Sequence, residues 1–147
     1  MFRVHYPQKR NILSITLHNP PELFPPYRGY AHAVEVGAGS RILFISGLNG
    51  FEADGVTMPE SFHDQAERIW KHIKAILAQA DMSVSNLVSL RTYLSSPEFD
   101  EENAQMRERQ LGGHRVSSTV IVCQLLETKW KLEVEAVAAG ASSSRAP

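Results

Sequence analysis

The spacing of the apolar residues within 61–80 constrains the fold of this chain more than any other feature of its sequence. They recur at spacings of three and four and form one stripe along a helix: Phe62, Ala66, Ile69, Ile73, Ile76, Leu77 and Ala80. Ser61 is a residue type favoured at a helix N-cap, and Asp64 places negative charge in the first turn. The pattern predicts a long helix whose apolar side has to be buried against another layer of structure.

Strand patterns lie on both sides of this helix. Residues 30–36 alternate, "GAGS" supplies a turn, and residues 41–46 continue as a strand, so a β-hairpin is predicted there. Further strands are expected at residues 86–94, 118–124 and 132–138. A second helix is expected to begin at Ser96 and Pro97 and to end at Gly112 and Gly113.

The resulting order, β-β-α-β-α-β-β, predicts an α+β fold with a mixed, mostly antiparallel sheet and both helices packed on one face. A chain of 147 residues is long enough for one domain with its own core. Residues 1–29 hold five of the eight prolines and are expected to form an arm, in which only residues 11–17 alternate like a strand. We therefore expect an arm at 1–29, a domain at 30–139 and a flexible tail at 140–147.

Composition argues against several classes of partner. The net charge is -1, and no cluster of Lys and Arg is present, so neither nucleic acid nor an anionic membrane surface is an expected partner. The longest apolar runs fall far short of the roughly 20 residues that span a bilayer. With no apolar core of a signal peptide and a single cysteine, we expect a cytoplasmic protein.

The histidines and the cysteine give no sign of a metal site or of a nucleophile. The nearest helical pair, His63 and His72, lies nine residues apart, whereas zinc ligands are much more closely spaced. No G-x-S-x-G elbow occurs. Cys123 falls in an apolar strand pattern and is expected to be an inert core thiol. We predict neither metal nor cofactor.

Two polar features stand out from this background. Glu133 and Glu135 share one face of the last strand, where they either face solvent or, beside a cleft, can activate water. Asn103 falls on the same helical stripe as Phe99 and Met106 and so points inward or toward an interface.

Several runs of the chain together resemble the Rid family of reactive intermediate deaminases, the YjgF-like proteins. These runs are "GYAHAVEVGAGSRILFISG", "DQAERIWKHIKAILAQA" with "DMSVSNLVSLRTYL", "FDEEN", and "SSTVIVCQLL" followed by "KLEVEAVA". The resemblance covers residues 29–139 and rests on the order and spacing of the runs. It implies a chorismate-mutase-like fold and a homotrimer with clefts between subunits.

The resemblance also implies an activity. Active members hydrolyse enamines and imines, such as 2-aminoacrylate, to 2-keto acids and ammonia without metal or organic cofactor. An arginine just before the penultimate strand grips the substrate carboxylate, and a glutamate in the last strand positions or activates water. By this resemblance Glu133 is the catalytic residue, and Tyr30, Ser46, Gly47 and Asn103 complete the pocket.

The arginine is where this chain departs from the family. Members read Arg-Ser-x-Val, whereas this chain reads Ser117-Ser118-Thr119-Val120, with Ser117 in the arginine's position and Thr119 where many members have cysteine. The backbone near Ser118 and Thr119 is expected to bind the polar end of the ligand. Arg115 has the same strand parity as Ser117 and lies about 7 Å away along an extended chain. It either reaches the pocket or is a solvated loop cation.

Three functions remain open from the sequence. The leading expectation is hydrolysis of an imine or enamine whose anchor differs from the usual one, because losing a bidentate arginine costs about a hundredfold or more. The first alternative is a non-catalytic trimer that binds a metabolite, and the second is a Rid fold recruited to another reaction. Ribonuclease activity, also ascribed to this family, has little support in a chain without a basic patch.

Overall fold

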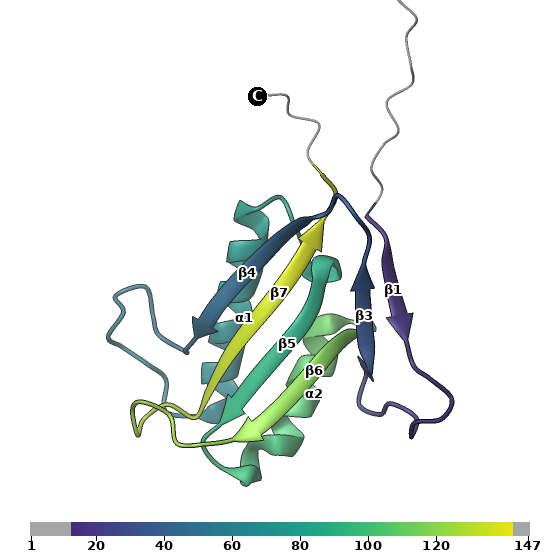
Figure 1. Cartoon of the computed structure of the whole chain (residues 1–147). Coiled ribbons are helices and arrows are strands. Elements are labelled where there is room, and N and C mark those ends of the chain that lie inside the picture. Colours follow the sequence, from purple (N-terminus) through teal and green to yellow (C-terminus); the bar gives the residue numbers. More distant parts are fainter. Residues whose placement is uncertain (1–12, 143–147) are drawn as a thin grey trace, which may run out of the picture.

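The computed structural model describes residues 13–142, which form a five-stranded sheet, two helices behind it and a separate two-stranded sheet at one side (Figure 1). The larger sheet has the order β2-β6-β5-β7-β4. Its strands are β2 (Tyr30–Ala31), β4 (Arg41–Leu48), β5 (Leu87–Leu94), β6 (Val116–Val122) and β7 (Leu132–Gly140). Strand β6 runs parallel to β2 and β5, and β7 runs antiparallel to β4 and β5. The predicted α+β class with a mixed, mostly antiparallel sheet is confirmed.

Both helices begin where the sequence predicts a cap or a turn. Helix α1 (Phe62–Gln79) starts after Ser61, whose hydroxyl accepts a hydrogen bond from the backbone N–H of Asp64 at 3.1 Å. The second helical segment opens with a 3₁₀ turn, η2 (Pro97–Phe99), and continues as α2 (Asp100–Leu111). A second 3₁₀ turn, η1 (Val84–Asn86), leads into β5. Gly112 ends α2 in the left-handed conformation, with φ 57°.

The core lies between the helices and one face of the sheet. The predicted stripe of α1 faces it, with Ile69, Ile73 and Leu77 fully buried. Along β7 the even-numbered residues from Leu132 to Ala138 are buried, whereas Glu133 and Glu135 face the other side. We call that other side the open face, because within residues 13–142 no helix covers it (Figure 1).

The predicted hairpin between residues 30–36 and 41–46 is wrong. The chain breaks at His32 into β2 and β3 (Ala33–Val36), and β3 pairs with β1 (Ile15–His18) in the small sheet. His32 is held out of the strand because its backbone N–H donates to the Asn19 side chain at 2.9 Å and its ring bonds the Phe24 carbonyl at 2.7 Å. Strand β4 pairs instead with β7, where it can bury Ile45.

The ends of the chain are described only in part. A strand is predicted at residues 11–17 and is observed at Ile15–His18. The outer part of the predicted arm, residues 1–12, and most of the predicted tail, residues 143–147, lie outside the described residues. Among residues 13–142, no helix is both long and apolar enough to cross a membrane.

Candidate functional site

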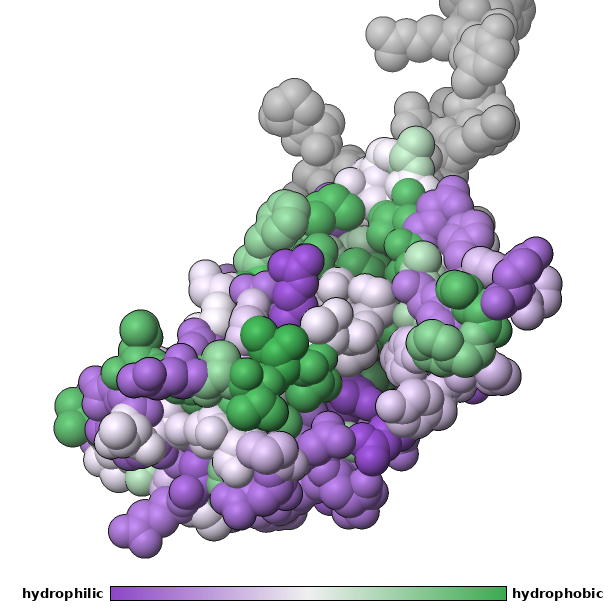
Figure 2. Space-filling view, turned by 60° about the horizontal axis from the view of Figure 1, so that its bottom comes forward, coloured by the Kyte–Doolittle hydropathy of each residue, from purple (hydrophilic) through white to green (hydrophobic). Residues whose placement is uncertain are grey.

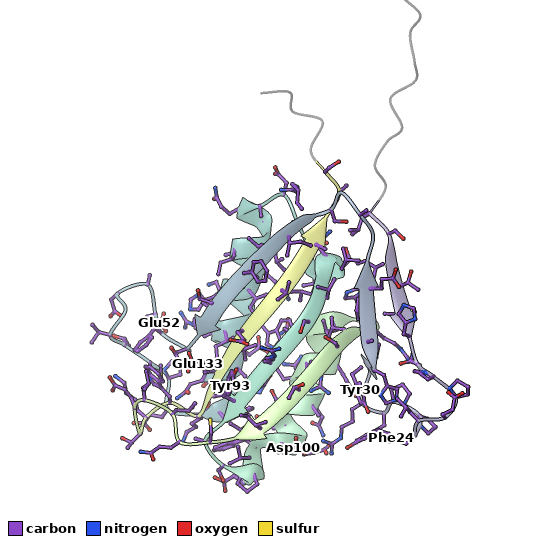
Figure 3. The ribbon with its side chains drawn as sticks, in the orientation of Figure 1. Phe24, Tyr30, Glu52, Tyr93, Asp100 and Glu133 are labelled. Carbon is purple, nitrogen blue, oxygen red and sulfur yellow. The ribbon has the colours of Figure 1, made fainter. Side chains whose placement is uncertain are left out.

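The predicted site residues separate into two groups on different parts of the sheet. Tyr30 lies on the edge strand β2, whereas Gly47 lies on β4 at the opposite edge and Glu133 on its neighbour β7. Four strand spacings separate β2 from β4, which is about 19 Å. Figure 3 shows Tyr30 near Phe24, and Glu133 near Tyr93 on strands closer to the middle of the sheet. We call these two regions the tyrosine half-site and the glutamate half-site.

The glutamate half-site is a cavity of about 280 Å³ on the open face. It is lined by Gly47, Tyr93, Cys123, Gln124, Leu125, Leu126, Glu133 and Glu135. Tyr93 of β5 lies directly opposite Glu133 of β7 in the antiparallel register. Both side chains therefore leave the same face of the sheet and meet in this cavity.

A β-bulge at Ser46 and Gly47 shapes this cavity. Ile45 pairs with Ala136 and Leu48 pairs with Val134, so β4 carries one more residue than β7 between these pairs. A Cβ atom on Gly47 would collide with the carboxylate of Glu133. Gly47 thus lets that carboxylate lie against the strand. Ser46 lines a neighbouring cavity of about 400 Å³ on the open face.

The two carboxylates of β7 have different surroundings. Glu135 forms an ion pair with Arg91 of β5, with 3.2 Å between Oε1 and Nη1. Within residues 13–142, Glu133 forms no ion pair and no side-chain hydrogen bond. Glu133 is therefore the one of the two whose oxygens remain available to a water molecule or a substrate.

The tyrosine half-site is a cavity of about 320 Å³ beneath the chain that leads into β2. It is lined by Phe24, Tyr27, Arg28, Tyr30, Asp100, Arg107, Ser118 and Val120. Aromatic rings on one side of the cavity pack edge to face. The centroid of the His32 ring lies 5.1 Å from that of Phe24 and 5.6 Å from that of Tyr30, and the centroids of Tyr27 and Tyr30 lie 6.0 Å apart. These rings hold one another in place.

Two guanidinium groups reach this cavity, and they differ in their partners. Arg28 forms ion pairs with Asp100 and Glu101, each at 2.8 Å, and the hydrogen bond to Asp100 raises the pKa of Arg28. Arg107 is only 6% exposed, and burial lowers its pKa. Its Nη2 donates to the Arg28 carbonyl at 3.0 Å. Among the described residues its buried Nε has no hydrogen-bond partner.

Two further buried polar groups near Arg107 lack partners. Asn103 lies one helical turn before Arg107, is 5% exposed, and has no partner within residues 13–142 for its Nδ2. The Ser118 hydroxyl, which lines the cavity from β6, has none either. The prediction that Asn103 points inward agrees with its burial.

Around the expected arginine position only Ser118 lines one of the two half-sites, whereas Ser117, Thr119 and Arg115 line neither. Ser117 donates a hydrogen bond to the Val88 carbonyl at 3.3 Å, and Thr119 is exposed. Arg115 is exposed just before β6 and lines a different cavity, of about 290 Å³, with Gly29 and Glu108. Within one chain, Arg115 thus lines neither the tyrosine nor the glutamate half-site.

Sequence reasoning missed several residues that line the half-sites, among them Cys123, Tyr93 and Arg107. Cys123 is half-buried in the glutamate half-site, so the expectation of a core thiol is wrong. Strand β6 ends at Val122 rather than at residue 124, which leaves Cys123 in the following connection. Two spacings in the sequence could have indicated the other two residues. Tyr93 lies two positions after Arg91, so both side chains leave the same face of β5, and Arg107 lies four residues after Asn103, one turn further along α2.

A metal site is not evident in the described part of the chain. Among residues 13–142, no group of three or more His, Cys, Asp or Glu side chains is arranged to hold a metal ion. The polar groups of both half-sites are guanidinium, hydroxyl and amide groups, which donate hydrogen bonds, and carboxylates, which accept them. This set suits hydrogen bonding to a small polar molecule.

Comparison with known proteins gives consistent matches. The family model described as Endoribonuclease L-PSP matches residues 22–140. A RutC family protein of Aquifex aeolicus is 28% identical over 115 residues, which covers 78% of this chain and 90% of that protein. The mitochondrial protein MMF1 of Saccharomyces cerevisiae is 21% identical over 130 residues, 88% of each chain. The crystal structure of the Rid family protein YyfB from Yersinia pestis, itself of unknown function, superposes with a TM-score of 0.75 at 26% identity, covering 84% of this chain and 97% of that one.

Proposed function

Because the chain belongs to the endoribonuclease L-PSP family, which includes the YjgF and Rid proteins, we propose that it hydrolyses a reactive imine or enamine to a carbonyl compound and ammonia. Family membership supports a role in small-molecule metabolism. The observation that carries the proposal is the Glu133 carboxylate, which has no ion-pair or side-chain hydrogen-bond partner among residues 13–142 and lies in a cavity beside Tyr93 and Gly47.

The proposed chemistry needs a base, for which Glu133 is the candidate, and polar groups that hold the substrate. An enamine first takes a proton on carbon to become an imine. Water then adds across the C=N bond: its oxygen bonds to carbon and nitrogen gains a proton, which gives a carbinolamine. The hydroxyl proton of the carbinolamine then passes to nitrogen, the C–N bond breaks as the C=O bond forms, and ammonia leaves. Glu133 accepts a hydrogen bond from the attacking water and takes its proton. Tyr30, Asn103 and the backbone near Ser118 and Thr119 hold the polar end of the substrate.

We propose that the complete site forms between two copies of the chain. Within one chain Tyr30 on β2 and Glu133 on β7 are three strand spacings apart, about 14 Å. Ser118 and Glu133 also leave opposite faces of the sheet, so one small substrate cannot touch both half-sites. In a closed ring of three subunits, the tyrosine half-site of one copy faces the glutamate half-site of the next. The open face supports such an assembly, because it exposes Ile42, Phe44 and Ile121.

A direct test is the release of ammonia from 2-aminoacrylate that a dehydratase generates in place. Larger imines, formed by an amino acid oxidase, are assayed in parallel. The expected result is faster ammonia release with the protein than with buffer for at least one imine, and its loss in Glu133→Gln. Background rates for every imine would overturn the proposal.

Mixing two inactive variants tests the composite site. Tyr30→Ala damages one half-site and Glu133→Gln the other, so each homotrimer has only defective sites. After unfolding and refolding a 1:1 mixture, random association in a closed trimer restores about a quarter of the sites. Recovery of about a quarter of wild-type turnover is expected. No recovery, with mixed trimers present by native mass spectrometry, would place each site within one chain.

A non-catalytic, metabolite-binding trimer is the second candidate. It is favoured by Ser117, which stands where the resemblance calls for an arginine, since serine cannot replace two charge-assisted hydrogen bonds. Keto-acid binding that survives Glu133→Ala, together with absent turnover, would support it. Recruitment of the fold to another reaction is the third candidate, and it predicts turnover of a pathway intermediate that is not an imine. RNA cleavage, which the family description suggests, is not supported by a chain of net charge -1.

A further inference from the structure

We infer that Arg107 is the substrate anchor and that the tyrosine half-site accepts a carboxylate bearing an aromatic side group. The inference rests on the proposed function and deepens it, because it names the anchor and the substrate class of the same site. It is carried by one buried cation, by the unpartnered groups around it and by the aromatic rings above it.

The first step is the environment of the Arg107 guanidinium. Burying a cation costs free energy unless an anion or several acceptors compensate it. Arg107 is 6% exposed, and within residues 13–142 it forms no ion pair and one hydrogen bond, to the Arg28 carbonyl. The acidic groups at the start of α2, Asp100 and Glu101, are taken by Arg28. Glu108 and Asp100 act on Arg107 through space without forming an ion pair, so a carboxylate in the cavity would supply the direct anionic partner that Arg107 lacks among residues 13–142.

The second step concerns which element of the fold supplies the positive charge to the cavity. The family resemblance calls for a cation at position 117, on the open face of β6. Ser118 points to the other face, toward the cavity that Arg107 enters from α2. Ser118 and Arg107 therefore line one cavity from two elements, with Asn103 one turn away. In this chain a cation next to Tyr30 therefore comes from helix α2 and not from strand β6.

The third step is the aromatic wall, defined as Phe24, Tyr27 and Tyr30. Phe24 and Tyr27 are 65% and 63% exposed, which is unusual for large aromatic rings in a well-packed part of a protein. They are nevertheless held in place, because the His32 ring contacts Phe24 and bonds its carbonyl, and Tyr27 contacts Tyr30 edge to face. Arg28 also lies over the Tyr27 ring, 5.7 Å from its centroid.

Size agrees with an aromatic occupant. A cavity of about 320 Å³ falls at the lower end of the range for small-molecule sites. A substrate as small as 2-aminoacrylate would leave most of the aromatic wall in water. A phenyl or phenol ring against Phe24 and Tyr27 would remove that surface from water and bind about ten to a hundred times more tightly than a methyl group.

The experiment measures the binding of stable keto acids to the full-length protein by isothermal titration calorimetry. Phenylpyruvate is expected to bind at least ten times more tightly than pyruvate. Arg107→Gln is expected to weaken phenylpyruvate binding about a hundredfold, and Arg107→Lys less than that. The matched control, Arg109→Gln, removes a cation of the same helix that pairs with Glu67, and it leaves binding unchanged.

The aromatic wall has its own pair of variants. Phe24→Ala is expected to weaken phenylpyruvate binding about tenfold and to leave pyruvate binding unchanged. Leu23→Ala truncates a neighbouring exposed residue that does not line the cavity, and both affinities stay at the wild-type value. Equal losses for the two keto acids in Phe24→Ala would overturn the aromatic part of the inference.

A probe without mutation covers the case in which Arg107→Gln fails to fold. Wild-type protein is titrated with 3-phenylpropanoate and with the neutral 3-phenylpropanamide. The anion is expected to bind at least ten times more tightly, and equal binding overturns the anchor. Unchanged affinity in a folded Arg107→Gln variant, or loss of binding in Arg115→Gln, overturns it as well.

Failure of the inference and failure of the proposed function give different results. Turnover of 2-aminoacrylate with no preference for aromatic imines, and with Arg107→Gln fully active, refutes the inference and leaves the function intact. Arg107-dependent binding of phenylpyruvate without ammonia release from any imine refutes the function and leaves the binding site intact.

Discussion

At the scale of single residues, Glu133 and Glu135 illustrate how neighbours decide what a side chain can do. Both leave the same face of β7, two positions apart. Glu135 is neutralised by Arg91, whereas Glu133 lies in a cavity against Gly47. Alternation along a strand predicts the shared face, but only the cross-strand partners separate a paired carboxylate from one that can bind water.

Gly47→Ala tests this contact. A Cβ atom would collide with the Glu133 carboxylate, and that flexible side chain can rotate away at little cost to stability. We expect kcat for imine hydrolysis to fall about a hundredfold, the size of a lost general base, with Tm nearly unchanged. Gly55→Ala is the contrasting variant, since its φ is +69° and nothing lies near a Cβ there. It should lower Tm and leave kcat unchanged. A fully active Gly47→Ala would contradict the proposed role of Glu133.

The Asp54 carboxylate gives a pH prediction. Hydrogen bonds from the Thr57 hydroxyl and from the backbone N–H groups of Val56 and Thr57 lower the pKa of Asp54. The order that these bonds give the loop is therefore fully present above the ordinary Asp pKa and is lost as pH falls through the lowered value. Carbon-detected NMR titration should place the Asp54 midpoint below about 3.9. Thr57→Val should move the midpoint upward, and an unmoved midpoint would exclude the hydroxyl as the main cause.

At the scale of elements, the sequence correctly predicted the features of helices and strands that depend on local periodicity. The stripe of α1 and the alternation of β7 are both confirmed, because each depends on side chains spaced along one element. The hairpin failed because pairing between strands depends on distant residues, here Asn19 and Phe24 holding His32. Strand β4 instead pairs with β7, which lies almost a hundred residues later in the chain.

Helix α1 also fixes the connection between β6 and β7 through one side chain. The buried amide of Gln65 donates to the carbonyls of Pro59 and Lys129, at 2.8 and 3.0 Å, and accepts from the Lys131 N–H at 2.9 Å. This connection carries Cys123 and the residues that follow it into the glutamate half-site.

Gln65→Leu should therefore weaken both stability and the site. It leaves three backbone groups without a partner, and we expect the free energy of unfolding to fall by about 2 to 4 kcal/mol in urea denaturation. We also expect a lower kcat in the folded fraction. Gln79→Leu, at the exposed end of the same helix, should change stability by less than about 0.5 kcal/mol. Equal effects of the two substitutions would exclude Gln65 as the fixing contact.

At the scale of the whole molecule, the open face of the sheet exposes large apolar side chains, among them Ile42, Phe44 and Ile121. Figure 2, in which the bottom of the molecule is turned forward, shows hydrophobic side chains gathered in patches between polar ones. The resemblance to the Rid family named Tyr30, Gly47, Asn103 and Glu133. It could not name Arg107, because an arginine on a helix is read as a surface residue unless its depth in the fold is known.

Phe44→Glu tests whether the open face joins the subunits. Phe44 is 79% exposed on β4, and a carboxylate there would be desolvated in an interface. Sedimentation should show a shift from trimer to monomer, together with loss of imine hydrolysis and a retained circular dichroism spectrum. Val56→Glu, an exposed apolar position in the loop after β4, should keep the assembly and the turnover. A Phe44→Glu variant with wild-type mass would assign the interface to another surface.

The chain leading into β2 has a consequence for how such a protein can change over time. Phe24 and Tyr27 lie outside the sheet and the helices, and neither belongs to the buried core. Substitutions there alter the aromatic wall at little cost to folding, while Glu133 stays on a strand whose neighbours are fixed by packing. Substrate preference and hydrolytic chemistry can therefore vary independently. One scaffold of this kind could be retuned from one reactive metabolite to another by exchanging a few loop residues.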